Sequence, residues 1–300
     1  MSPFLSSLPE NFSGEIKENE LLKYHTGFRM GGPASLMLIP GGIGDLRQSL
    51  VWAGKNRIPC RVMGNGSSIL AHPDGFKGLV IKVANALNHI RIKGKQIYAG
   101  AGASMRALLR KARNHGLTGL EEWWGTPSSV GGWFMRMGRV KNPHLDHLIQ
   151  EVYIMEPDGS ISRWIEPSKL FKNDGTLDGV VVEVVFRLKT GIKEVMERRI
   201  QIKESEWDFL TQTDLPLAGP VFLSKEDLTE VFIKAQVSGF KKDGVAFLGV
   251  GNGFIANLGN PGFQDLFNLI GEIKDKVSSI QQLDFKDGLS RLLVKEVIRC

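Results

Sequence analysis

Residues 60–68 read Cys-Arg-Val-Met-Gly-Asn-Gly-Ser-Ser, a short apolar strand that runs straight into a loop of two glycines and two serines. Glycine lets successive backbone N–H groups turn toward one point and lets an anion approach the backbone closely. The loop is therefore a candidate cradle for a pyrophosphate, although a tight turn at the end of a strand would use the same residues. Its candidate ligand-binding residues are Gly64, Asn65, Gly66, Ser67 and Ser68.

A second loop, residues 125–132, combines glycines, hydroxyl groups and small residues in the same way: Gly-Thr-Pro-Ser-Ser-Val-Gly-Gly. Two such loops predict a ligand with a long polar midsection, such as a dinucleotide. The preceding Trp123 and Trp124 either flank a planar ring of that ligand or belong to the core. The candidate ligand-binding residues here are Gly125, Thr126, Pro127, Ser128, Ser129, Gly131 and Gly132.

Composition narrows the class of protein. The 300 residues are 42% hydrophobic and 23% charged, which excludes global disorder. The net charge of +6 is modest and dispersed; it is compatible with a phosphate-bearing ligand and is a weak argument for nucleic acid, which is not expected as a partner. No run of about 18 apolar residues is present, so no membrane span is expected. The two cysteines, Cys60 and Cys300, fit no metal site or disulfide framework, and the expected location is the cytoplasm.

Hydrophobic periodicity and turn signals predict a mixed α/β chain of the α+β class. Hairpins are expected around Lys93-Gly94-Lys95 and Pro157-Asp158-Gly159. Ser224 with Asp227 resembles a capping box that opens a helix to about residue 237. A boundary is expected near residue 190. Helices are further predicted over about 45–56, 104–115, 192–210 and 263–277, and a last strand over 292–298.

The segment 25–34, His-Thr-Gly-Phe-Arg-Met-Gly-Gly-Pro-Ala, resembles the HTxFRxGGPA opening of the MurB family. These are the FAD-dependent UDP-N-acetylenolpyruvoylglucosamine reductases of peptidoglycan (cell-wall) synthesis. Further segments resemble the family in the same order, and the resemblance covers about residues 20–300. They are residues 64–70, 115–121, 125–132, 216–222 and 254–259.

The resemblance implies an architecture. After a lead-in of residues 1–20, an FAD-binding unit of the PCMH or vanillyl-alcohol-oxidase type is expected over 21–190, with subdomains of about 21–84 and 85–190. A smaller C-terminal α+β substrate domain of the MurB type would follow over 191–300.

The resemblance also implies a chemistry. FAD would bind non-covalently, and Arg29 and Gly31 join its candidate ligands. Hydride would pass from NADPH to the flavin and on to the enolpyruvyl group of a UDP-sugar, as in UDP-N-acetylmuramate dehydrogenase. No metal is expected, and no protein partner is indicated.

This chain departs from the family where the family holds its catalytic groups. Pro220 occupies the position of the serine that donates a proton, and residues 167–179 contain neither the family's arginine nor its tyrosine. Ser224 is a substitute hydroxyl or a helix N-cap. Glu296 matches the family's C-terminal glutamate and is either catalytic or an ordinary edge charge. Arg136 is unusual as a cation in an expected glycine-rich loop; its partner is a flavin, a phosphate or solvent.

Three functions therefore remain open. The first is a divergent UDP-N-acetylenolpyruvoylglucosamine reductase with a rearranged proton donor. The second is a flavin oxidoreductase that acts on another substrate. The third is a catalytically impaired homologue that retains FAD.

Overall fold

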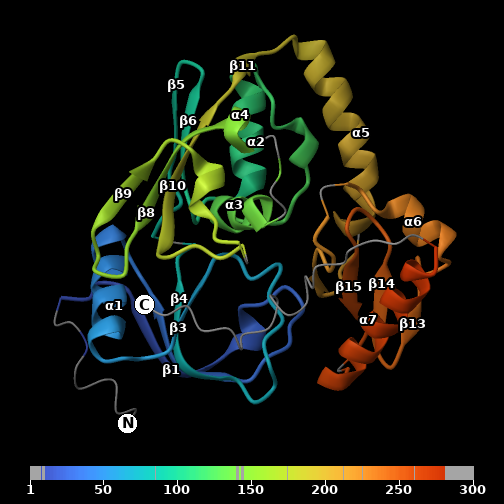
Figure 1. Ribbon diagram of the computed structural model, residues 1–300, viewed down its shortest axis with the longest axis horizontal. Helices are drawn as coiled ribbons and strands as arrows, with labels where there is room; N and C mark the ends of the chain where they lie inside the picture. Colours follow the sequence, from blue (N-terminus) through green and yellow to red (C-terminus); the bar gives the residue numbers. More distant parts are fainter. Residues whose placement is uncertain are drawn as a thin grey trace.

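The computed structural model contains, in its described residues, three β-sheets of four or five strands and one two-stranded sheet, with helices packed on them (Figure 1). It describes residues 8, 11–84, 86–139, 142, 145–173, 175–211, 213–224, 226–259 and 261–280. Glu296 and the strand predicted over residues 292–298 lie outside these residues. No helix in the described ranges is both long enough and apolar enough to cross a membrane.

The first sheet has the strand order β1-β2-β4-β3, in which β2, β4 and β3 are parallel and β1 is antiparallel to β2. Helix α1 makes the crossover between β2 and β3. Strand β1 lies almost wholly within the expected lead-in and forms the edge of the sheet. The elements are β1 (Glu15–Leu21), the 3-10 turn Leu22–Tyr24, β2 (Pro33–Ile39), α1 (Ile43–Lys55), β3 (Cys60–Met63) and β4 (Phe76–Lys82).

The second sheet is antiparallel, in the order β5-β6-β10-β8-β9, and confirms both predicted hairpins. Its strands are β5 (Ile90–Lys93), β6 (Gln96–Gly100), β8 (Ile149–Met155), β9 (Ile161–Trp164) and β10 (Val180–Arg187). Its helices are α2 (Met105–Asn114), α3 (Val130–Arg139) and α4 (Leu145–Leu148), with 3-10 turns at Glu121–Trp123 and Pro167–Leu170. The short strands β7 (Leu117–Thr118) and β11 (Lys189–Thr190) pair beside it.

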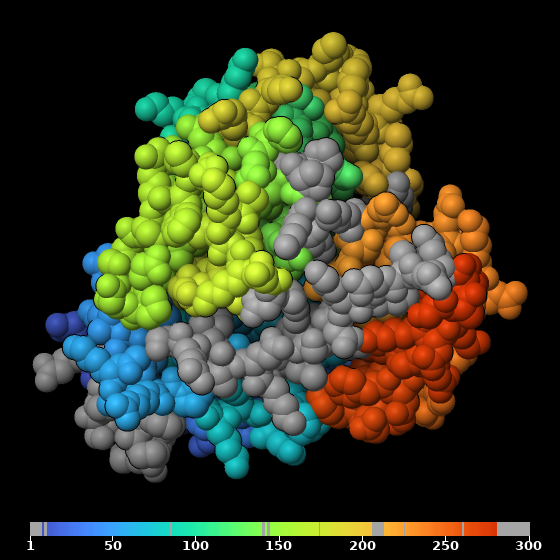
Figure 2. All heavy atoms as spheres, in the orientation of Figure 1, coloured from blue at the N-terminus to red at the C-terminus, as the bar shows by residue number. Residues whose placement is uncertain are grey.

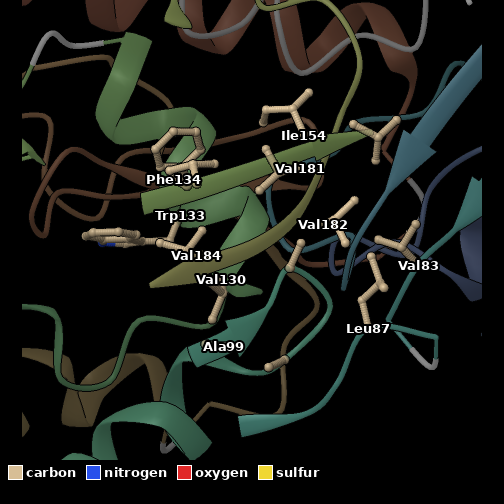
Figure 3. Close-up of a cluster of buried hydrophobic side chains, with 14 of the residues drawn as sticks. Val83, Leu87, Ala99, Val130, Trp133, Phe134, Ile154, Val181, Val182 and Val184 are labelled. Carbon is tan, nitrogen blue, oxygen red and sulfur yellow. The ribbon is translucent and has the colours of Figure 1, made fainter. Parts of the chain in front are cut away.

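Helix α3 replaces the glycine-rich loop expected around Arg136. Val130, Trp133, Phe134 and Met137 recur at helical spacing and are all buried, which gives this stretch an apolar face despite its glycines. Figure 3 shows Val130, Trp133 and Phe134 beside Val184 of β10, in the core between α3 and the second sheet. The expectation of a loop was wrong because the apolar periodicity outweighs the low helix propensity of glycine.

The third unit, which runs from α5 to α7, contains a sheet with the strand order β12-β15-β14-β13, in which all neighbouring strands are antiparallel. Its sheet and last helices form an orange-to-red lobe in Figure 2. The predicted capping box is wrong: α6 begins only at Thr229, and the Ser224 hydroxyl instead accepts a hydrogen bond from the Glu226 N–H (3.1 Å). The elements are α5 (Lys193–Thr211), β12 (Leu217–Ala218), α6 (Thr229–Lys234), β13 (Lys241–Lys242), β14 (Val245–Leu248), β15 (Phe254–Asn257) and α7 (Phe263–Ser278).

A carboxylate on the second sheet makes stability depend on pH. Arg163 donates to both oxygens of Glu151 (2.9 and 2.7 Å), and Tyr153 donates a further hydrogen bond (2.8 Å). The Arg163 hydrogen bonds lower the pKa of Glu151 to about 2. Because the folded-state pKa lies below the unfolded value, this stabilisation is complete above about pH 4.5 and is lost as the pH falls toward 2.

We expect Arg163→Leu to lower the free energy of unfolding only slightly at pH 7, since the arginine is largely exposed and solvent screens the ion pair. The difference from the wild type should shrink as the pH falls from about 4.5 toward 2. Urea unfolding between pH 2.5 and 7 measures it. Lys93→Leu removes a cation from the same sheet and should leave the pH dependence unchanged; a difference for Arg163→Leu that is constant with pH would contradict the assignment.

Candidate functional site

The loop after β3 lies at the carboxyl end of the parallel strands, where Met63 pairs with Lys82 of β4. Gly66 has φ +72°, and a Cβ there would lie 2.0 Å from the His25 carbonyl oxygen, so this position requires glycine. Within the described residues, the N–H groups of residues 65–68 donate to no acceptor. The predicted anion cradle therefore has backbone donors available at the end of a strand.

The second predicted loop packs directly on the first. A Cβ at Gly64 would lie 2.3 Å from Ser129 Oγ and 3.0 Å from Ser129 Cβ. The N–H groups at the start of α3 are already used: Val130 donates to Ala103 O (2.8 Å) and Gly131 to Ala101 O (2.8 Å). We therefore expect an anion to bind at the first loop and not at the N-terminus of α3.

Two hydroxyl groups of the second loop are buried without partners. Thr126 Oγ1 and Ser128 Oγ are enclosed and make no hydrogen bond in the described part of the chain. A buried hydroxyl without a partner costs free energy, so such groups are expected where a ligand supplies the missing acceptor or donor. Together with the close loop contact and the available N–H groups, they fit the polar midsection of a dinucleotide such as FAD.

The third unit contacts the same loop. Gly219 N–H donates to Ser67 O (3.2 Å), and the Ser68 hydroxyl donates to Gly219 O. A Cβ at Gly27 would lie 2.5 Å from Leu217 O and 3.3 Å from Ser67 Cα, so the segment of residues 25–34 is clamped between loop and β12. Pro220, which stands where the family has its serine, therefore directly follows the residue that contacts the loop, Gly219.

A polar chain lies behind the cradle. Lys82 Nζ donates to His25 Nδ1 (3.1 Å), and His25 Nε2 donates to Glu20 Oε1 (2.7 Å), which assigns the neutral tautomer with its proton on Nε2. Burial, with a further contribution from Lys17, lowers the pKa of Lys82. His25 fixes the turn whose carbonyl contacts Gly66. The sequence analysis did not identify Lys82, for which the only signal was a lysine ending an apolar strand.

Several other predicted residues lie outside the junction of the loops. Arg29 is exposed with φ +54°, and its side chain forms no hydrogen bond or ion pair among the described residues. Gly31 packs against the core, since its Cβ would lie 2.5 Å from Ala71 Cβ. Trp123 is 8% exposed and packs edge-to-face on Trp133 (5.2 Å), and Trp124 donates to Glu204 Oε1 (3.0 Å). Of the two alternatives for the tryptophan pair, Trp123 therefore belongs to the core.

A separate cavity of about 90 Å³ lies between α3 and two loops of the third unit. Arg136 and Ser224 both line it, so the structure brings together two residues that the sequence singled out separately. Burial lowers the pKa of Arg136 to about 10. The cavity is lined by Glu122, Trp123, Arg136, Met137, Asn142, Phe222, Leu223, Ser224 and Asn252.

Comparison with known proteins gives the class and the family. The family described as FAD binding domain matches residues 34–164. A UDP-N-acetylenolpyruvoylglucosamine reductase from Halalkalibacterium halodurans is 30% identical over 298 residues, covering 95% of this chain and 97% of that protein. The crystal structure of MurB from Thermus caldophilus superposes with a TM-score of 0.69 at 24% identity, covering 91% of this chain and 98% of that one. Berberine bridge enzyme matches 64% of this chain and 44% of its own, with a TM-score of 0.50 at 14% identity.

The fold is thus that of a two-subdomain FAD-binding protein with a further α+β unit. The chain belongs to the UDP-N-acetylenolpyruvoylglucosamine reductase, or MurB, family. This confirms the family and the fold class that the sequence motifs predicted. The individual cofactor-binding residues remain predictions.

We expect Gly64→Ala to weaken FAD binding at least tenfold, because the new Cβ collides with Ser129 and pushes the two loops apart. Quenching of flavin fluorescence on titration of apoprotein measures the affinity. Gly44→Ala is the control, because its Cβ meets nothing within 4 Å on α1. Equal FAD affinity in both variants would show that the spacing of the loops does not position the cofactor.

We expect Thr126→Val to act with opposite signs on the two forms of the protein. Removal of a buried hydroxyl without a partner should leave the apoprotein equally stable or stabilise it by up to about 1 kcal/mol, yet weaken FAD binding by roughly 5- to 20-fold. Thermal unfolding and FAD titration give the two readouts. Thr229→Val is the control: its hydroxyl accepts from Gly251 N–H (2.8 Å), so it should destabilise the fold and spare FAD affinity.

Proposed function

We propose that this chain is an FAD-dependent oxidoreductase of the UDP-N-acetylmuramate dehydrogenase type. The observation that carries the proposal is the contact of both glycine-rich loops with each other and with the third unit, in a chain that covers 97% of a reductase relative. On this proposal its substrate is a UDP-sugar with an enolpyruvyl group, its reductant is NADPH, and it works in the cytoplasm.

The residues proposed to bind FAD fall into two sets, one with free backbone N–H groups and one with unpaired hydroxyls. The N–H groups of residues 65–68 would bind the pyrophosphate of FAD, and the hydroxyls of Thr126 and Ser128 would pair with further polar atoms of the cofactor. FAD, when bound, supplies hydride transfer to an acceptor. The first residues of α3 would exclude water from the junction, because Val130 and Gly131 are buried.

Protonation of the substrate is the step for which this chain lacks the side chain that the family uses. Reduction of an enol ether requires a proton on the carbon next to the one that receives hydride, and Pro220 carries no side-chain proton. Residues 167–179 supply no arginine. Ser224 lies four residues further along the chain and lines a cavity, so it is a candidate substitute for the missing hydroxyl. Glu296 keeps its proposed catalytic role by family position alone.

Pro220 also supports a second candidate function, a member of the family that retains FAD and has lost turnover of the UDP-sugar. The two candidates differ in one measurement. Oxidation of NADPH that depends on UDP-N-acetylenolpyruvoylglucosamine supports the reductase, whereas a bound flavin that is not reoxidised by that compound supports the impaired homologue. Oxidation of NADPH without the UDP-sugar would point instead to another acceptor.

We expect Pro220→Ser to raise UDP-sugar-dependent turnover by roughly 10²-fold, the lower end of what a positioned general acid contributes. Steady-state oxidation of NADPH measures kcat, and a shifted pH profile should accompany the gain. Pro216→Ser, which changes a neighbouring proline before β12, should leave kcat unchanged. Unaltered turnover in a correctly folded, FAD-loaded Pro220→Ser protein would show that position 220 does not face the reacting carbon.

A further inference from the structure

We propose that Arg136 binds the carboxylate of the substrate's enolpyruvyl group, in the cavity between α3 and the loop of residues 222–224. This inference rests on the proposed function, since it takes the UDP-sugar as substrate. It assigns an anion-binding role to a residue that stands where the family pattern has none, in a chain whose usual arginine segment is missing.

The position of Arg136 on α3 places it at the margin of the apolar face of that helix. Val130, Trp133, Phe134 and Met137 form the face that packs on the second sheet, and Arg136 is outside that face. Its side chain instead lines the cavity together with Ser224 and Asn252 of the third unit. A cation is thus held on a helix anchored in the core, facing a segment that begins two residues after Pro220.

Arg136 has no counter-ion in the described part of the chain. No carboxylate forms an ion pair with it; Glu122 lines the same cavity but is exposed and makes no recorded pair with the guanidinium. Burial lowers the pKa of Arg136 to about 10, so the group is still charged at pH 7. A partly buried cation without a partner is costly to fold, and an anionic ligand would remove that cost.

The other polar groups of the cavity suit a carboxylate. Ser224 lines the cavity and its Oγ accepts from Glu226 N–H (3.1 Å), which leaves the hydroxyl proton available for a ligand. Asn252 Nδ2 donates to Ser224 O (3.0 Å), which holds the serine backbone in place. A guanidinium and a hydroxyl facing one small space are a donor set for a carboxylate, which arginine can bind through two parallel hydrogen bonds.

The size of the cavity selects the carboxylate over the diphosphate of the same substrate. Its volume of about 90 Å³ is well below the roughly 300–1,000 Å³ of ordinary ligand pockets. The space admits a group of a few atoms and not a nucleotide. The cradle at residues 65–68 already offers N–H donors for a pyrophosphate, so the cavity is left for the smaller anion.

The test compares two ligands that differ only in the enolpyruvyl group. FAD-loaded wild type and Arg136→Gln are titrated by calorimetry with UDP-N-acetylenolpyruvoylglucosamine and with UDP-N-acetylglucosamine. We expect the variant to bind the first ligand at least about tenfold more weakly and the second within about twofold of the wild type. Arg136→Lys should regain only part of the loss, because an ammonium does not form the two parallel hydrogen bonds.

Further measurements separate this loss from damage to the fold. Arg136→Gln should keep its FAD content and unfold at the same or a higher temperature than the wild type, because a buried unpaired charge is gone. Arg106→Gln, which removes an exposed cation on α2, should bind both ligands as the wild type does. Ser224→Ala should weaken only the enolpyruvyl ligand, and by less than Arg136→Gln.

The outcomes are distinguishable. Equal weakening of both ligands would place Arg136 at the nucleotide and overturn the inference while leaving the proposed function intact. Unchanged binding of both ligands would also overturn the inference and leave the proposed function intact. A wild type that holds FAD but binds neither ligand would overturn the proposed function, and the inference with it.

Discussion

The contact between the loop of residues 64–68 and its three neighbours is the constraint on which the rest of the structure depends. Gly64 meets Ser129 of the second unit, Gly66 meets the His25 carbonyl, and Ser67 and Ser68 bond to Gly219 of the third unit. A side chain at either glycine would separate the units. The loop therefore fixes the three larger sheets relative to one another. Its N–H groups remain available to a ligand because these contacts use other atoms of the loop.

Ligand-binding groups in this molecule carry a cost in stability that other contacts must offset. The hydroxyls of Thr126 and Ser128 are buried without partners, and the Arg136 cation is partly buried without a counter-ion. Each lies next to well-packed core: Trp133 and Phe134 are fully buried on the same helix as Arg136. Rigid packing of α3 on the second sheet supplies the free energy that keeps such groups in place, as is common where stability and binding compete.

Local signals sufficed for parts of the fold and failed where tertiary packing decides. Two hairpins could be predicted from their turns, because a tight turn requires the residue types of Lys93-Gly94-Lys95 and Pro157-Asp158-Gly159. The motif of residues 25–34 identified the family because several of its positions have no freedom, as Gly31 against Ala71 shows. Helix α3 was missed since Gly131, Gly132 and Gly138 mask an apolar face that only the second sheet completes. The shared cavity of Arg136 and Ser224 was also beyond reach, because the two residues are far apart in sequence and only the docking of the third unit brings them to one cavity.

The departures from the family then form a coherent pattern. Positions that shape the cofactor loops are kept, whereas the groups that complete the reaction have changed together: Pro220 removes a proton donor and residues 167–179 remove an arginine. A chain that had only lost catalysis would gain stability by replacing Arg136 with an apolar residue, since nothing in the described fold repays its burial. An arginine without a counter-ion in the described fold, which lines one cavity with Ser224, instead argues that an anion binds between α3 and the third unit. On the proposed function, Pro220 changes how the proton arrives, and Arg136 takes over recognition of the substrate's carboxylate.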